Sequence, residues 1–331
     1  MARLQLNANP WSWSARYFRA ASGENLWFAM LIIPAILILL GVIVIPMAWA
    51  FKMSLANTSV AVVAGHGTVQ GQFVGLQNYV QLLKSSQFWS AFRETLYFWV
   101  VSIVLEIVVG IGMALLLNRQ FRGYWIVRAV IFIPWAIPTV VNATLWGMIF
   151  NGNNYGALND LLLRWGWIKS PIVWLNPSPV LVHIPWLSHA LYWLGSNQAI
   201  NAIIVGDEWK TLPIVAFLVL AGLQMIPHEL YEAARVEGAS AWRQLTYITI
   251  PLIGPILSVV LILRTMQLLR AFTIIFTLEG YGLPLLSISA YQQAFSFGNF
   301  GTGAAVAFLI GVIALIVSYF YVKGLYREEL Q

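Results

Sequence analysis

Long apolar runs, separated by short polar stretches, dominate this chain. A helix that crosses a bilayer needs about 20 mainly apolar residues. We predict six spans, which cover approximately residues 26–51, 92–118, 124–150, 210–227, 250–277 and 302–323. The pattern therefore predicts an all-α integral membrane protein.

The composition supports this fold class. Of 331 residues, 60% are hydrophobic and 9% are charged, whereas roughly 25% of residues are charged in an average soluble domain. These proportions exclude intrinsic disorder, a coiled coil and a disulfide scaffold. Because the chain has no cysteine, thiolate catalysis and cysteine-based metal sites are excluded as well. The net charge of +6 is expected at the membrane edges, where basic residues set orientation, rather than on a nucleic-acid-binding surface.

The distribution of positive charge predicts the orientation of the chain. Cytoplasmic loops carry an excess of Lys and Arg. With six spans and the N-terminus inside, ten basic residues fall in the cytoplasm and six outside. The cytoplasmic set is Arg3, Arg16, Arg19, Arg119, Arg122, Arg128, Arg235, Arg243, Lys323 and Arg327, and the outer set is Lys52, Lys84, Arg93, Arg164, Lys169 and Lys210. We therefore expect both termini in the cytoplasm.

The predicted spans also define the segments that lie before and between them. Residues 1–25 mix aromatic and basic side chains and are expected to form a cytoplasmic or interfacial segment, and residues 26–331 form the transmembrane domain. We interpret residues 52–91 as an outer loop followed by a short surface helix, and residues 151–209 as a turn-rich outer insertion. Within that insertion, the apolar residues 180–194 are too few for a span, so we expect a re-entrant or interfacial piece.

The segment between the fourth and fifth predicted spans has the chemistry of a short surface helix. Pro227 is tolerated in a first helical turn, and Glu232 can pair with Arg235 three residues later. Gly238 would end this helix, and Ser240 would cap the start of a second one. Small residues on one side and charges on the other predict a docking element.

This segment also carries a recognisable motif. Three residues separate the tripeptide Glu232-Ala233-Ala234 from Gly238, and nine residues separate Gly238 from Ile248-Thr249-Ile250-Pro251. The spacing resembles the EAA signature of permease subunits of binding-protein-dependent ABC importers, with Ile250 where Leu is usual.

Other segments resemble the carbohydrate branch of that family, which includes maltose permeases of the MalF type and trehalose permeases. The resembling segments are Asn118-Arg119 at the end of the second predicted span, Trp209–Pro213, Leu223–Pro227 and Ala290–Phe295. The chain departs from the branch at Glu279–Pro284, where Thr-Gly-Gly-Gly-Pro is common, and in its longer insertion at residues 180–206.

The resemblance implies a type I ABC importer permease fold with a coupling helix at about residues 228–245, which sits in a groove of a cytoplasmic ATPase. The residues carried over to this contact are Glu232, Ala233, Ala234, Gly238 and Pro251. The chain itself is expected not to be an enzyme and to hold no cofactor or metal, because ATP and Mg belong to the ATPase subunits. In agreement, the sequence contains no GxxxxGK[ST] phosphate loop.

The resemblance also implies a function and a set of partners. The chain would form half of the pathway for a disaccharide or oligosaccharide, such as maltose or trehalose, in a prokaryotic inner membrane, with alternating access driven by ATP. The implied partners are a second permease, which would be a different, MalG-like chain, two ABC ATPase subunits and an extracytoplasmic sugar-binding protein. Carbohydrate and membrane lipid complete the set, and nucleic acid is not a partner.

Ionisable residues within predicted spans are costly and mark either an internal pair or a pathway. Glu106, Arg264 and Arg270 occupy such positions. Glu106 would neutralise an arginine, or the arginines would face sugar hydroxyls. Residues whose chemistry suits a sugar pathway are Trp135, Asn142, Trp146, Arg264, Gln267, Arg270 and Tyr291. For the aromatic members, an interfacial belt is the alternative.

Two other function classes remain open from the residues alone. A membrane-embedded enzyme acting on lipid-linked sugars would need paired acids on an outer loop, and Asp207-Glu208 is the one such pair. A secondary carrier would use Glu106 as its coupling carboxylate, but such carriers usually contain internal repeats, and the chain shows no clear one. In a secondary carrier the EAA segment would also have no role.

Overall fold

The computed structural model describes residues 24–63, 66–119, 121–179 and 185–325. These ranges belong to two units, residues 1–53 and 54–331, which we describe separately. Most of the predicted N-terminal segment, residues 1–23, lies outside the described residues.

The first unit is one long apolar helix with a local irregularity. It comprises α2 (Glu24–Leu39), the π-helical turn η1 (Leu40–Val44) and α3 (Ile45–Ser54). In its described part, Ile32–Ser54 is long and apolar enough to cross a membrane, and its most apolar stretch is entirely unburied within this chain. A helix that is apolar on all sides needs an apolar environment such as lipid. The prediction of a first span near residues 26–51 is therefore confirmed.

The second unit opens with a β-hairpin. Strands β1 (Ala56–Val63) and β2 (His66–Phe73) pair antiparallel in a register that runs from Ala56 opposite Phe73 to Val63 opposite His66. Our loop prediction for this region was wrong. The glycines indicated a loop, but β-branched residues alternate along β1, and such residues suit a pleated strand. The predicted surface helix is present as α4 (Gln77–Lys84).

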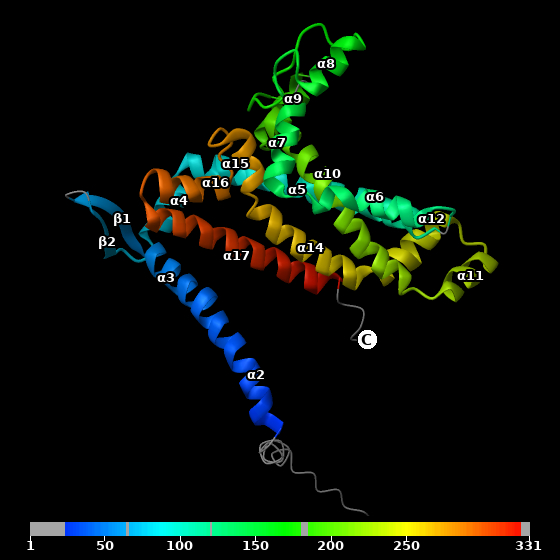
Figure 1. Ribbon diagram of the computed structural model, residues 1–331, viewed down its shortest axis with the longest axis horizontal. Helices are drawn as coiled ribbons and strands as arrows, with labels where there is room; N and C mark the ends of the chain where they lie inside the picture. The colour runs from blue at the N-terminus through cyan, green and yellow to red at the C-terminus, as the bar shows by residue number, and fades with distance from the viewer. Residues whose placement is uncertain (1–23, 64–65, 120, 180–184, 326–331) are drawn as a thin grey trace, which may run out of the picture. The chain divides into compact units, whose positions relative to one another are not determined.

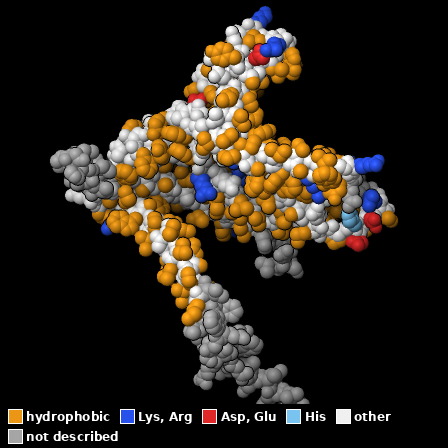
Figure 2. Space-filling view, in the orientation of Figure 1, with side chains coloured by type: hydrophobic (Ala, Val, Ile, Leu, Met, Phe, Trp, Pro, Cys, Tyr) orange, Lys and Arg blue, Asp and Glu red, His pale blue; other side chains and the backbone are white. Residues whose placement is uncertain are grey.

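The helices of the second unit pack around three clusters of buried apolar side chains. In Figure 1, α5 and α10 run beside each other and α14 runs beside α17. Figure 2 shows that hydrophobic side chains cover most of the visible face of this unit and that charged groups gather at the α8 and α11 ends. The principal helices are α5 (Ser86–Leu117), α6 (Tyr124–Ala136), α7 (Thr139–Ile149), α10 (Gln198–Gln224), α14 (Gly254–Leu269), α15 (Thr273–Glu279) and α17 (Phe300–Leu325).

Shorter elements connect these helices. They are α8 (Ala157–Arg164), α9 (Pro185–Trp193), α11 (His228–Val236), α12 (Ala241–Gln244), η2 (Leu245–Thr249), α13 (Ile250–Leu252), α16 (Leu286–Tyr291) and η3 (Gln292–Ser296).

The described residues contain four helices long and apolar enough to span a membrane, or up to six spans if each of two bent pairs counts as one. If each bent pair is one span, the total of six agrees with the six predicted spans. One bent pair is α6 with α7, which meet at 93°. Pro134 lies in the last turn of α6 and Pro138 caps α7, so the bend falls where proline removes backbone donors.

The outer insertion is shorter than we predicted. Residues 198–209, which we assigned to it, form the first turns of α10. We misjudged this boundary because Asp207, Glu208 and Lys210 lower the local apolar content. Of the predicted re-entrant piece, residues 180–184 lie outside the described residues, and α9 is nine residues long, too short for a span.

Close packing of α5 on α10 requires glycine at position 110. A Cβ added to Gly110 would lie 2.7 Å from Val215 Cγ1, whereas a Cβ added to Gly112 would meet nothing within 4 Å. We predict that Gly110→Ile lowers the free energy of unfolding by about 1–3 kcal/mol, measured by thermal unfolding in detergent. Gly112→Ile is the matched control and should unfold near the wild-type temperature. Equal effects of the two substitutions would contradict this packing.

Candidate functional site

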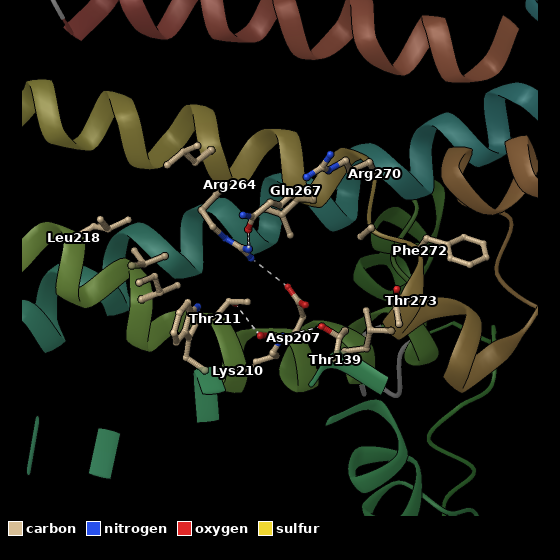
Figure 3. Close-up of a pocket in the computed structure, with 17 residues that line it drawn as sticks. Thr139, Asp207, Lys210, Thr211, Leu218, Arg264, Gln267, Arg270, Phe272 and Thr273 are labelled. Carbon is tan, nitrogen blue, oxygen red and sulfur yellow. Dashed lines mark hydrogen bonds and ion pairs between the residues drawn. The ribbon is translucent and has the colours of Figure 1, made fainter. Parts of the chain in front are cut away.

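A polar cavity of about 530 Å³ lies along α10 and α14. This volume is within the usual range for small-molecule sites. Figure 3 shows the polar side chains that border it, which come from α7, α10, α14 and the start of α15. They are Thr139, Asp207, Lys210, Thr211, Arg264, Gln267, Arg270 and Thr273, and Trp135 and Phe272 add aromatic surface.

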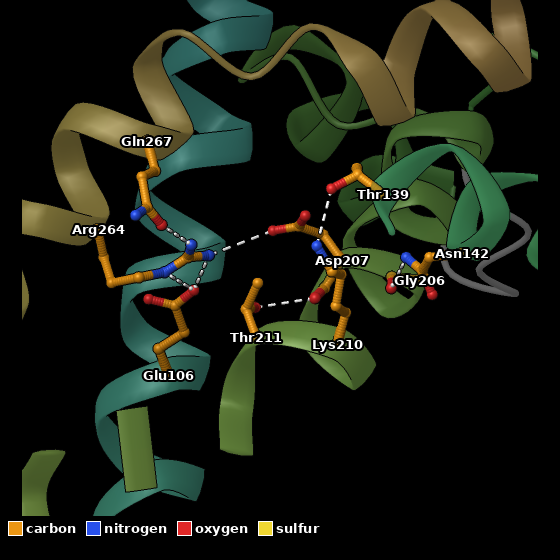
Figure 4. A network of polar contacts seen from close by, with 9 residues as sticks. All are labelled: Glu106, Thr139, Asn142, Gly206, Asp207, Lys210, Thr211, Arg264 and Gln267. Carbon is orange, nitrogen blue, oxygen red and sulfur yellow. Dashed lines mark hydrogen bonds and ion pairs between the residues drawn. The ribbon is translucent and has the colours of Figure 1, made fainter. Parts of the chain in front are cut away.

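Arg264 organises one wall of this cavity and is 6% exposed. Its Nε donates to Glu106 Oε1 at 2.7 Å, and its Nη2 donates to the same oxygen and, at 3.2 Å, to Asp207 Oδ2. Its Nη1 donates to Gln267 Oε1. Figure 4 shows this network, which joins α5, α10 and α14. Each of the three guanidinium nitrogens therefore donates at least one hydrogen bond inside the protein, and a buried charge needs such partners.

The sequence left two interpretations of Arg264, an internal ion pair with Glu106 or a position in the sugar pathway, and the structure is compatible with both. Glu106 is 1% exposed and pairs with Arg264, as the structural interpretation expected. The same Arg264 also lines the cavity together with Gln267. Glu106 and Asp207 therefore hold the Arg264 guanidinium in place, and the same side chain forms part of the cavity wall.

Two further cations face the cavity without a carboxylate partner. Lys210 Nζ donates to Thr139 Oγ1 at 2.7 Å, and Arg270, at the end of α14, is exposed. Among the described residues neither forms an ion pair. Their charges are therefore available to a bound molecule or a partner subunit.

The predicted pathway residues divide into two groups. Trp135, Arg264, Gln267 and Arg270 line the cavity, and the other three lie outside its lining. Asn142 is buried and donates to Gly206 O at 3.0 Å, and Trp146 packs against the same glycine. Tyr291 packs on Phe272, with the ring centroids 4.8 Å apart.

Sequence reasoning missed several lining residues on α10, notably Asp207, Lys210 and Thr211. It placed the first two in an outer segment. Their spacing of three and four residues was the available signal, because it places all three side chains on one face of a helix.

The EAA segment forms a separate exposed element. Helix α11 turns by 72° from α10, with Pro227 at its start. Gly238 ends it with φ of +78°, Gly238 N donates to Arg235 O, and Ala239 N donates to Ala234 O. These bonds satisfy the last carbonyls of the helix in the Schellman arrangement.

The predicted local chemistry of this segment is also present. Ser240 caps α12 by accepting from the Arg243 backbone N–H at 3.4 Å, and Glu232 lies 4.0 Å from Arg235. The Tyr231 hydroxyl and Thr249 Oγ1 are 2.9 Å apart, which ties α11 to the turn before Pro251. The Glu232 side chain is 70% exposed, and Ala233 and Gly238 are exposed beside it. The segment thus presents a fixed, accessible surface.

A sequence family described as "Binding-protein-dependent transport system inner membrane component" matches residues 106–327. The chain belongs to this family. The EAA resemblance is therefore confirmed, and the protein is a multi-pass permease subunit of an ABC importer rather than a secondary carrier.

Individual relatives agree with this assignment. The permease is 36% identical over 304 residues to the trehalose/maltose transport system permease protein MalF of Thermococcus litoralis, covering 91% of this chain and 94% of that protein. It is 32% identical to the sulfoquinovosyl glycerol transport system permease protein SmoG of Agrobacterium fabrum, covering 91% of each. Its fold matches a bacterial ABC transporter involved in the import of the acidic polysaccharide alginate, with a TM-score of 0.74, 23% identity, and coverage of 95% of this chain and 99% of that one.

Proposed function

We propose that this permease forms half of the pathway of a sugar importer and that its cavity contacts a sugar of about disaccharide size. The observation that carries the proposal is the lining: hydroxyl, amide and cationic donors surround a volume of about 530 Å³ beside an aromatic side chain, Trp135. Sugars are bound through hydroxyl hydrogen bonds and stacking on aromatic faces. The trehalose and maltose named for the Thermococcus litoralis relative are of this size.

The proposal includes coupling to a separate ATPase through α11. The support is geometric: Glu232 is exposed, small residues lie beside it, and capping bonds fix the helix end. A groove on another protein can approach such a surface closely. Glu232 would make the ionic contact, Ala233, Ala234 and Gly238 would allow the close approach, and Pro251 would fix the exit into α14. ATP and Mg would be held by the ATPase subunits and not by this chain.

The proposed contact between α11 and an ATPase also implies a topology for the chain and a composition for the transporter. If α11 faces the cytoplasm and four spans precede it, the N-terminus is cytoplasmic, and two further spans return the C-terminus to the same side. The complete transporter would contain a second, MalG-like permease, two ATPases and an extracytoplasmic sugar-binding protein. The partner permease would supply the second wall of the cavity.

A second candidate substrate is a sugar that carries an acidic group. Lys210 and Arg270 face the cavity without an ion-pair partner among the described residues, and cations so placed favour an anionic ligand. The Agrobacterium fabrum relative is named for a sulfonated sugar derivative.

One uptake experiment tests both substrate classes. The complete transporter in proteoliposomes would be assayed with trehalose, maltose and an acidic disaccharide. We expect Gln267→Ala to raise KM about threefold to tenfold, since it removes about one hydrogen bond to the sugar, and Gln77→Ala, an exposed glutamine of α4, to change nothing. Arg270→Gln should weaken only uptake of the acidic sugar if that class is the substrate. Unchanged KM values in Gln267→Ala and Arg270→Gln for every sugar would remove the cavity from the pathway.

A further inference from the structure

A group of three carboxyl side chains lies between α5 and α10, next to the Arg264 network. Glu106 comes from α5, and Asp207 and Glu208 come from α10. One carboxyl oxygen of each residue lies within 4.8 Å of those of the other two. Glu106 is 1% exposed and Glu208 is 5% exposed. Because Arg264 is the cation paired with this group, three ionised carboxylates would leave two negative charges unbalanced.

Arg264 engages only one side of the group. Its guanidinium donates to Glu106 Oε1 and Asp207 Oδ2. Within the described part of the chain, Glu106 Oε2 and both carboxyl oxygens of Glu208 have no hydrogen-bond partner although they are fully buried. Buried acceptors in folded proteins are nearly always satisfied, so these three carboxyl oxygens need partners that the described residues do not supply.

An independent side chain points to the same place. Ser102 lies one helical turn before Glu106 on α5, is 0% exposed, and its Oγ has no hydrogen-bond partner among the described residues. Its hydroxyl lies next to the Glu208 carboxyl. Ser102 therefore adds a buried neutral hydroxyl from α5 beside the Glu208 carboxyl from α10.

We propose that these oxygens bind a divalent cation of the size of Ca²⁺. A donor set made only of carboxylate and hydroxyl oxygens suits hard cations, and one divalent ion would balance the two remaining negative charges. Calcium binds oxygen at 2.3–2.6 Å, so two of its ligands can lie up to about 5 Å apart across the ion. The carboxyl oxygens of the group, which lie within 4.8 Å of one another, fit this limit. Magnesium, at 2.0–2.1 Å, would require oxygens within about 4.2 Å.

The ion would have a structural consequence for the cavity. Glu106 and Asp207 would each contact the ion on one side and Arg264 on the other. The ion would thus hold α5 against α10 and fix the guanidinium that forms the cavity wall (Figure 4). This inference does not depend on which sugar, if any, enters the cavity.

The test uses the full chain purified in detergent, treated with EDTA and then titrated with CaCl₂, MgCl₂ or NaCl. We expect elemental analysis before EDTA treatment to find about one divalent ion per chain, and Ca²⁺ to raise the unfolding temperature by a few degrees. Glu208→Gln should lose both the ion and the shift. Glu94→Gln is the matched control, because Glu94 lies on α5 with a buried, unpartnered Oε2 but outside the group, and it should respond as wild type does.

A milder variant keeps the proposal testable if Glu208→Gln does not fold. Ser102→Ala should raise the half-saturating Ca²⁺ concentration severalfold. The proposal is overturned if no divalent ion is found and Ca²⁺ causes no shift, or if Glu208→Gln and Ser102→Ala respond as wild type does. Stabilisation by Na⁺ alone, or by lower pH without added metal, would also overturn it, since monovalent ions or protons would then neutralise the carboxyls.

Discussion

Replacing Glu232 with lysine is expected to abolish sugar transport while the chain still folds and assembles. Glu232 is exposed on α11, and its one ion pair within the described part of the chain is a long, solvent-exposed contact with Arg235, which is worth little. The reversal therefore costs the isolated chain almost nothing. At a docked interface, the new positive charge would replace an attraction by a repulsion, and like charges in contact across an interface cost several kcal/mol.

The measurement is sugar-stimulated ATPase activity of the reconstituted transporter, together with the unfolding temperature of the chain. Glu237→Lys is the control, because Glu237 is also exposed but lies five residues later at the end of α11, on a different side of the helix. We expect stimulation to fall at least about tenfold in Glu232→Lys and much less in Glu237→Lys. Wild-type stimulation of ATPase activity in Glu232→Lys would contradict the coupling role.

Removing the Arg264 side chain should destabilise the protein strongly. Arg264→Ala would leave Glu106, 1% exposed, without its cation. Breaking a buried pair by removing one partner costs about 3–5 kcal/mol. We expect a lower yield and a loss of many degrees in unfolding temperature.

Two further variants separate structure from pathway. Arg270→Ala removes an exposed arginine from the same helix and cavity, so it should change unfolding by less than about 0.5 kcal/mol and affect only transport. Glu106→Gln added to Arg264→Ala removes one of the two acids left without their cation and should restore part of the lost stability. Wild-type stability of Arg264→Ala would show that the network does not support the fold.

The parts predicted well from the sequence depend on local chemistry. The C-terminal glycine and the Ser240 cap of the EAA segment follow from short-range backbone rules, and both are present. The bend of the third span falls at Pro134 and Pro138, where the missing backbone donors are a local property of the sequence. The long apolar runs gave the other spans because a membrane helix needs only length and apolar character.

The parts predicted poorly depend on contacts between distant segments. The start of α10 was placed twelve residues late because Asp207 and Glu208 are polar, and the pairing of Asp207 with Arg264, 57 residues away, cannot be read from a local window. The pairing of β1 (Ala56–Val63) with β2 (His66–Phe73) likewise depends on contacts between two segments and not on one local window. Glu106 and Arg264 were both identified, but their contact across 158 residues could only be offered as one alternative.

Purification of the tagged permease from its native membrane in mild detergent, followed by identification of the associated proteins and an ATPase assay, would test the account as a whole. We expect an ATPase with a phosphate loop and a second permease to co-purify, and trehalose, maltose or an acidic disaccharide, added with the cognate binding protein, to stimulate hydrolysis. A permease that purifies without an ATPase, or an ATPase that no sugar stimulates, would contradict the proposed role in sugar import.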